Sequence, residues 1–140
     1  MHNETMVKFG YPASLLKEFD HWAVMVRPAQ VTAGSLVLAA KSEATAFADL
    51  DPAAFAELST VVSWIEQRLA SRIRYERINY LMLMMVDPHV HFHIFPRYQG
   101  VRCVAEMAIQ DSGWPGPPDL NSATKLDAAA LEAAVCALGE

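Results

Sequence analysis

Residues 87–97 read DPHVHFHIFPR and place three histidines, His89, His91 and His93, in strict alternation. Successive side chains of a β-strand point to opposite faces, so this spacing predicts three imidazoles in one row on one face of a strand. The residues between them are apolar and are expected to pack on the opposite face. One face of this strand is therefore predicted to carry chemistry while the other contributes to the core.

Imidazole in this pattern favours a functional site over a structural one. The chain has five histidines, and three of them fall within five residues. Neither core packing nor charge balance requires an imidazole at every second position. Nucleophilic catalysis, proton transfer and metal binding all use imidazole. The segment is therefore predicted to form the active or binding site.

The segment resembles the signature of the histidine triad (HIT) superfamily, His-φ-His-φ-His-φ-φ with φ apolar, which residues 89–95 match throughout. The Pro96-Arg97 that follows is similar to the branch that includes dinucleoside polyphosphate hydrolases. The order of elements upstream agrees with the family over about residues 20–100. The expected elements are strands at 22–26, 35–40 and 78–85 and a helix at 52–70.

The resemblance implies a single α+β domain over residues 1–140, with a core at about 20–100 and a C-terminal loop and helix at about 101–140. Its expected architecture is an antiparallel sheet of about five strands, flanked by a central helix and a C-terminal helix. A length of 140 residues fits one domain.

Both helices also have signals of their own. Asp51 is a good N-cap before Pro52, and apolar residues follow at helical spacing as far as Leu69. The C-terminal helix is predicted at about 125–138, with Thr124 as N-cap and Asp127 completing a capping box.

The resemblance also implies a reaction and the residues that perform it. In the family, the middle histidine attacks the α-phosphorus of a nucleotide and forms a covalent nucleotidyl-imidazole, while a backbone carbonyl holds its other ring nitrogen. Here the nucleophile would be His91, supported by His89 and His93. The implied substrate is a small nucleotide conjugate, such as a dinucleoside polyphosphate or a nucleoside phosphoramidate, and no cofactor is required.

Three further residues are candidates for nucleotide binding because of their alignment with family positions. Ser35 stands after Gly34 where many members have a histidine, and Arg27 aligns with an Asp or Asn that usually meets the ribose. Asp87 stands where members usually carry phosphate-binding residues, because the chain runs directly from Val86 into Asp87-Pro88.

Two segments near these positions have two interpretations each. The apolar run 81–85 is expected to be core beside the sheet, with a ligand-binding wall as the alternative. Residues 111–119 contain three prolines and form a loop rather than a helix. The loop is either a flexible linker or, as Trp114 suggests, a segment packed on the domain.

Composition excludes several classes of function. A formal net charge of −5 disfavours general nucleic-acid binding, which needs a basic surface. No run of about 20 apolar residues indicates a membrane span, and the first residues lack the basic start of an export signal. A cytoplasmic location is therefore expected. The apolar content of 53% and the family resemblance predict a homodimer.

Two alternatives to catalysis remain open at this level. Two histidines at His-x-His spacing are a common start for a zinc site, although three alternate strand positions span about 13 Å, too far for all three to bind one ion. The other alternative is a catalytically silent nucleotide-binding module that keeps the fold.

Overall fold

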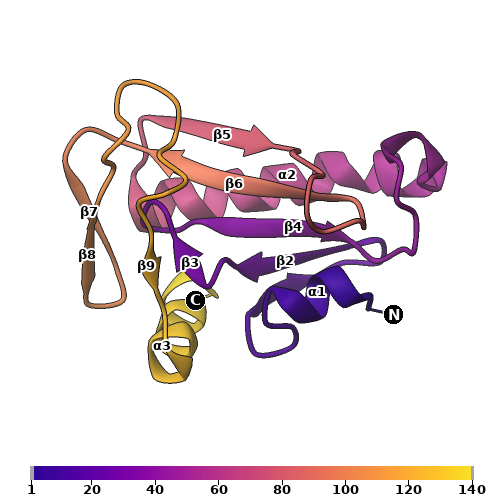
Figure 1. Cartoon of the computed structure of the whole chain (residues 1–140), viewed down its shortest axis with the longest axis horizontal. Coiled ribbons are helices and arrows are strands. Elements are labelled where there is room, and N and C mark those ends of the chain that lie inside the picture. The colour runs from indigo at the N-terminus through magenta and orange to yellow at the C-terminus, as the bar shows by residue number, and fades with distance from the viewer. Residues whose placement is uncertain (1, 140) are drawn as a thin grey trace.

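A five-stranded antiparallel sheet organises the chain, whose computed structural model describes residues 2–139 (Figure 1). In spatial order its strands are β1 (Leu15–Glu18), β2 (Trp22–Val26), β4 (Leu36–Ala40), β6 (His91–Arg97) and β5 (Arg77–Leu81). Two short ribbons complete the strands: β3 (Ala29–Gln30) with β9 (Thr124–Lys125), and β7 (Val101–Val104) with β8 (Met107–Gln110). The predicted α+β fold is confirmed.

Helices cover the two faces of the sheet unequally. The long helix α2 (Pro52–Ile73) and the C-terminal α3 (Ala128–Gly139) share the larger hydrophobic core with one face of the sheet. On the other face, the short helix α1 (Glu4–Lys8) packs Met6 against β2 and β4, and the rest of that face is less covered (Figure 1). A 3₁₀ turn, Phe47–Asp49, precedes α2.

Strand register puts the histidines of β6 on the face that α1 partly covers. His93 lies opposite Val37 of β4 and Leu81 of β5, and Val37 belongs to the cluster around α1. Ile94, one residue further along, belongs to the α2 side. Directly opposed residues share a face, so the alternation predicted for this strand is confirmed.

Helix α2 begins as predicted and ends three residues later. The Asp51 carboxylate accepts a hydrogen bond of 2.8 Å from the Ala53 amide, and Pro52 occupies the first turn. The helix continues past Ala70 to Ile73. Arg74 is its C-cap, with a left-handed φ of 55° and a backbone N–H that donates hydrogen bonds to the carbonyls of Leu69 and Ala70.

The C-terminal helix starts later than predicted. Thr124 is not its N-cap but belongs to β9 and pairs with Gln30 of β3, so that stretch is held extended. The cap is Asp127, whose carboxylate accepts a 2.8 Å hydrogen bond from the Ala130 amide. The helix therefore begins at Ala128.

Two strand boundaries also differ from the prediction. Strand β5 ends at Leu81 rather than at residue 85, and the left-handed φ of 53° at Met84 prevents the strand from continuing to that residue. Strand β6 begins only at His91, so His89 lies just outside it. Within residues 2–139, none of the helices has the length and apolarity needed to cross a membrane.

Candidate active site

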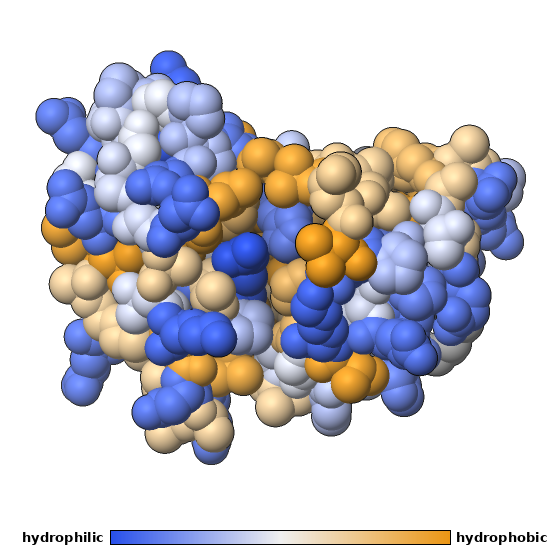
Figure 2. Space-filling model, in the orientation of Figure 1, coloured by the Kyte–Doolittle hydropathy of each residue, from blue (hydrophilic) through white to orange (hydrophobic). Residues whose placement is uncertain are grey.

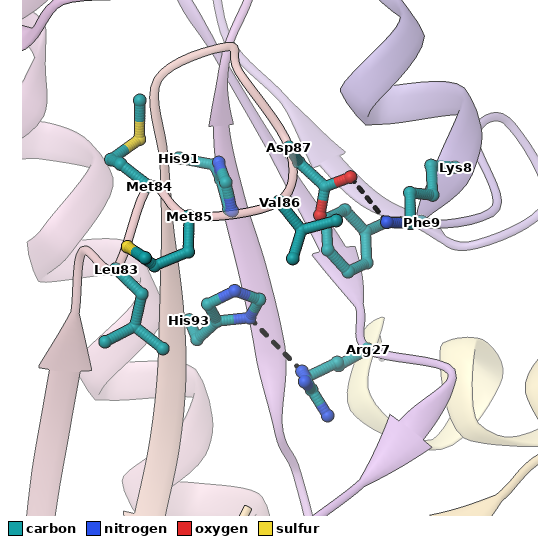
Figure 3. A pocket seen from close by; sticks show the side chains of 10 residues that line it. All are labelled: Lys8, Phe9, Arg27, Leu83, Met84, Met85, Val86, Asp87, His91 and His93. Atoms are coloured by element: carbon teal, nitrogen blue, oxygen red, sulfur yellow. Dashed lines mark hydrogen bonds and ion pairs between the residues drawn. The ribbon is translucent and has the colours of Figure 1, made fainter.

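A cavity of about 320 Å³ opens on the histidine face, between β6, the end of α1 and the loop that follows β5 (Figure 3). It is lined by Lys8, Phe9, Arg27, Leu83, Met84, Met85, Val86, Asp87, His91 and His93. Three segments distant in sequence thus meet around two of the three alternating histidines.

His91 is held in one tautomer. Its ring is buried, and Nδ1 lies 2.7 Å from the carbonyl oxygen of His89. A carbonyl can only accept, so Nδ1 carries the proton and the neutral ring keeps its lone pair on Nε2. That nitrogen is the one available to attack an electrophile.

His93 is held in the opposite tautomer. Its Nδ1 lies 3.2 Å from Nε of Arg27, and a guanidinium can only donate, so the neutral ring carries its proton on Nε2. Burial, followed by the nearby charges of Arg27 and His91, lowers the pKa of His93 to about 4. The ring is therefore neutral near pH 7 and offers an N–H donor, beside His91 at 5.0 Å between ring centroids.

His89 turns its ring away from this cavity. Its Nε2 lies 3.1 Å from the Glu43 carboxylate and its Nδ1 lies 2.9 Å from the Thr5 hydroxyl. Its ring lines a separate depression with Glu43 and the first residues of the chain. The cavity is thus lined by two imidazoles rather than a row of three, and the carbonyl of His89 supports it through the hydrogen bond from His91.

Arg27 follows directly after β2 and is fixed by several contacts besides His93. One of its terminal nitrogens donates to the Ala29 carbonyl at 2.7 Å, and the guanidinium lies 5.5 Å from the ring centre of Phe95. The side chain is thereby aimed into the cavity as a preorganised cation (Figure 3).

An ion pair spans the opposite side of the cavity. Lys8 Nζ, at the end of α1, lies 2.6 Å from the Asp87 carboxylate, which joins the helix to the loop before β6 (Figure 3). Phe9 follows and places its ring 5.7 Å from that of His91 and 5.5 Å from that of His93. The N-terminal segment is therefore one wall of the site.

The fold and the sequence agree with one family. A model of the HIT domain matches residues 10–100. The chain belongs to the HIT family. A search of curated protein sequences finds no match.

Solved HIT structures share the fold at low identity. A histidine triad protein from Bradyrhizobium japonicum is 20% identical with a TM-score of 0.73, over 99% of this chain and 94% of that one. One from Marinobacter aquaeolei VT8 is 16% identical with a TM-score of 0.75, over 99% and 92%. A hypothetical histidine triad nucleotide-binding protein from Sulfolobus tokodaii is 16% identical with a TM-score of 0.70, over 96% and 87%.

Ser35 lies away from the cavity of this HIT domain. It is fully buried, and its hydroxyl donates to the Thr32 carbonyl at 2.6 Å while accepting from the Thr32 amide at 3.0 Å. These bonds close the turn that leads into β4. The structure therefore brings Arg27 and Asp87 to the histidines but does not bring Ser35.

The apolar run after β5 is divided between the core and the wall of the cavity. Residues beyond the end of that strand line the cavity, and Met85 and Val86 are 85% and 80% exposed. The left-handed turn at Met84 directs this segment across the mouth of the site. The expectation that the run packs beside the sheet is confirmed for Met82 and Met84, which pack against the larger core. It is wrong for Leu83 and Met85, which are exposed and fit the ligand-wall alternative.

Sequence reasoning missed the residues that the N-terminal segment and Glu43 contribute. Thr5 and Lys8 meet residues about 80 positions away, and no local pattern indicates such contacts. Of residues 2–139, no three histidine, cysteine or acidic side chains are grouped so that they could hold a metal ion. The geometry thus adds no argument for the zinc alternative.

Proposed function

We propose that this HIT domain cleaves a nucleotide conjugate at its α-phosphate, with His91 as the nucleophile. The observation that carries the proposal is the 2.7 Å hydrogen bond from His91 Nδ1 to the His89 carbonyl, which leaves the Nε2 lone pair facing the cavity. The nucleotide binding named for the Sulfolobus tokodaii protein supports the same class of ligand.

The first step transfers the nucleotidyl group to the protein. The His91 Nε2 lone pair forms a P–N bond to the α-phosphorus, and the bond from phosphorus to the leaving group breaks with its electron pair. The leaving group then takes up a proton. The imidazole gains positive charge in this step, and its Nδ1–H bond to the His89 carbonyl stabilises that charge.

The second step regenerates the protein. Water attacks the α-phosphorus and loses a proton, while the P–N bond breaks and its electron pair returns to Nε2 of His91. The product is a nucleoside monophosphate. If an alcohol or a phosphate attacked in place of water, the nucleotidyl group would be transferred to it, and the protein would act as a transferase.

Two residues beside His91, Arg27 and His93, are suited to bind the phosphate of the substrate. Arg27 brings a fixed positive charge, and neutral His93 brings an N–H donor on the same side of the cavity. Lys8 adds a second cation, although Asp87 neutralises it. Hydrogen bonds aimed at phosphate oxygens stabilise the charge that develops as the new bond forms.

The test is release of nucleoside monophosphate from a panel of conjugates by metal-stripped protein. The panel contains adenosine and guanosine phosphoramidates, dinucleoside polyphosphates and nucleotide sugars. His91→Asn should abolish release of the monophosphate. It should also abolish the nucleotidyl adduct of the protein, which intact-protein mass spectrometry detects after an alkaline quench. The control His21→Asn, at a histidine outside the cavity, should abolish neither. Release that survives in His91→Asn would overturn the proposal. A folded wild type that binds nucleotides without turnover would support the silent module instead.

We also propose that two copies of the chain form a homodimer, as expected for the family, and that the protein acts in the cytoplasm without a bound cofactor. Light scattering at several protein concentrations tests the first statement. A mass that stays at that of one chain would reject it.

A further inference from the structure

A second cavity, of about 510 Å³, lies at the far end of β6 from His91. Its lining comes from β5, from the end of β6 and from the loop after β8. The lining residues are Arg77, Asn79, Arg97, Trp114, Pro115, Gly116 and Pro117. The reaction proposed above does not use this cavity.

The two cavities share one face of the sheet. Three pairs of opposed residues in β5 and β6 follow one another on this face: Arg77 with Arg97, Asn79 with Phe95, and Leu81 with His93. The first two pairs contribute to the second cavity, and His93 of the third lines the first cavity. Successive pairs on one face are about 7 Å apart, so the second cavity adjoins the catalytic one along the strands. Figure 2 shows this face, hollowed near its centre between a mostly hydrophilic part at upper left and a hydrophobic patch right of centre.

A buried ion pair builds the wall of the second cavity. Arg97 is only 3% exposed and binds the Asp111 carboxylate through Nε at 2.7 Å and through a terminal nitrogen at 3.0 Å. The same terminal nitrogen donates to the Gly116 carbonyl at 2.9 Å. A Cβ at Gly113 would collide with the Pro117 carbonyl oxygen. The proline-rich loop is therefore packed on the domain in a defined conformation, not a flexible linker.

The lining has the chemistry of a site for an aromatic anion. Trp114 is half-buried and offers an indole ring. Arg77 is exposed, and within residues 2–139 its guanidinium hydrogen-bonds to the carbonyl of Glu76 alone. Among the residues that line the cavity there is no acidic side chain, and Asp111 already balances Arg97. The net charge facing the cavity is thus positive, beside a surface on which a planar ring can stack.

We propose that this cavity, the Trp114 subsite, binds the leaving-group end of the conjugate when that end is an aromatic ring bearing an anionic group. The inference rests on the proposed function, since the α-phosphate must sit at His91 for the rest of the conjugate to run along β6. Trp114 stacks on the ring, and Arg77 pairs with the anionic group. The subsite is then a determinant of specificity for the leaving group.

The experiment compares two substrates that differ in the leaving group. Diadenosine triphosphate carries an aromatic anion at that end, whereas adenosine 5′-phosphoramidate carries only ammonia. Loss of one stacking contact corresponds to at least about fivefold in affinity, so Trp114→Leu should raise KM for diadenosine triphosphate by about that factor. Arg77→Gln, at an exposed position that tolerates substitution, should raise the same KM and reduce its salt dependence.

Controls separate this inference from the proposed function. Trp64→Leu, on α2 and distant from both cavities, should leave KM unchanged. Equal effects of Trp114→Leu and Arg77→Gln on both substrates, or no effect on either, would reject the subsite. If no conjugate of the panel is cleaved, the proposed function fails. Calorimetric binding of intact diadenosine triphosphate to His91→Asn, with and without Trp114→Leu, still tests the subsite, and equal affinities would overturn it.

Discussion

The carbonyl oxygen of His89 accepts a 2.7 Å hydrogen bond from Nδ1 of His91, two residues along the same chain. The ring of His89 points elsewhere, between Thr5 and Glu43, and those contacts hold the backbone at this position. The tautomer of His91 therefore depends on a residue whose own side chain does not enter the cavity.

Removing the Thr5 hydroxyl should weaken this support. Thr5→Val leaves Nδ1 of His89 buried without a donor, at an expected cost of about 1–3 kcal/mol in the free energy of unfolding. The turnover rate should fall as well, because the His89 carbonyl is less well held. Urea denaturation and nucleotide release measure the two effects. Thr5→Ser keeps the hydroxyl and should restore both, and a Ser variant as impaired as the Val variant would contradict the argument.

The pKa of His93, about 4 in the folded protein against 6.5 for the free side chain, makes stability depend on pH. The unfolded chain binds more protons between these values, so this contribution is complete above about pH 6.5 and is lost as the pH falls toward 4. Its expected size is of the order of 1–3 kcal/mol. Urea denaturation at pH 7 and pH 5 should show a smaller difference for His93→Gln than for the wild type. An unchanged difference would refute the assignment to His93.

The Lys8 to Asp87 ion pair should affect binding through charge. Lys8→Met leaves an unpaired carboxylate beside the phosphate position, and KM for an anionic conjugate should rise about two- to fivefold, as expected for a partly exposed pair. High salt should reduce the difference. Adding Asp87→Asn to Lys8→Met should bring KM back toward the wild-type value. A double variant as weak as the single one would show that repulsion is not the cause.

The buried pair of Arg97 and Asp111 should dominate the stability of the C-terminal loop. Asp111→Asn leaves the guanidinium buried without its counter-charge, at an expected cost of about 3–5 kcal/mol. Thermal unfolding followed by circular dichroism measures the loss. The exposed pair of Arg102 and Glu76 provides the comparison, and Arg102→Gln should cost no more than about 1 kcal/mol. Equal losses in the two variants would contradict the role given to burial.

Much of the fold was predictable because the sequence signals for its strands and helices are local. Alternation placed His91 and His93 on one face of a strand, and Asp51 with Pro52 marked the start of α2. The boundaries that failed are those where distant pairing competes with local preference. Thr124 would cap a helix well, but pairing with Gln30 of β3 holds it in a strand.

The candidate site was predicted only in part for the same reason. Arg27 and Asp87 were chosen by alignment with family positions and do line the cavity, whereas Ser35, chosen in the same way, is used inside a turn. Lys8 and Phe9 were not predicted at all. Their place beside the histidines depends on how α1 packs on β2 and β4.

The sequence by itself determined which residues can share a strand face and where the main helix begins, because a period of two and a capping residue act over a few positions. Only the tertiary structure decided that β6 begins at His91, so that His89 contributes a carbonyl instead of a ring. It also decided that Arg97 binds Asp111 and the Gly116 carbonyl, so that the loop carrying Trp114 packs at the end of β6. Such contacts arise from packing between segments distant along the chain, which local sequence patterns do not encode.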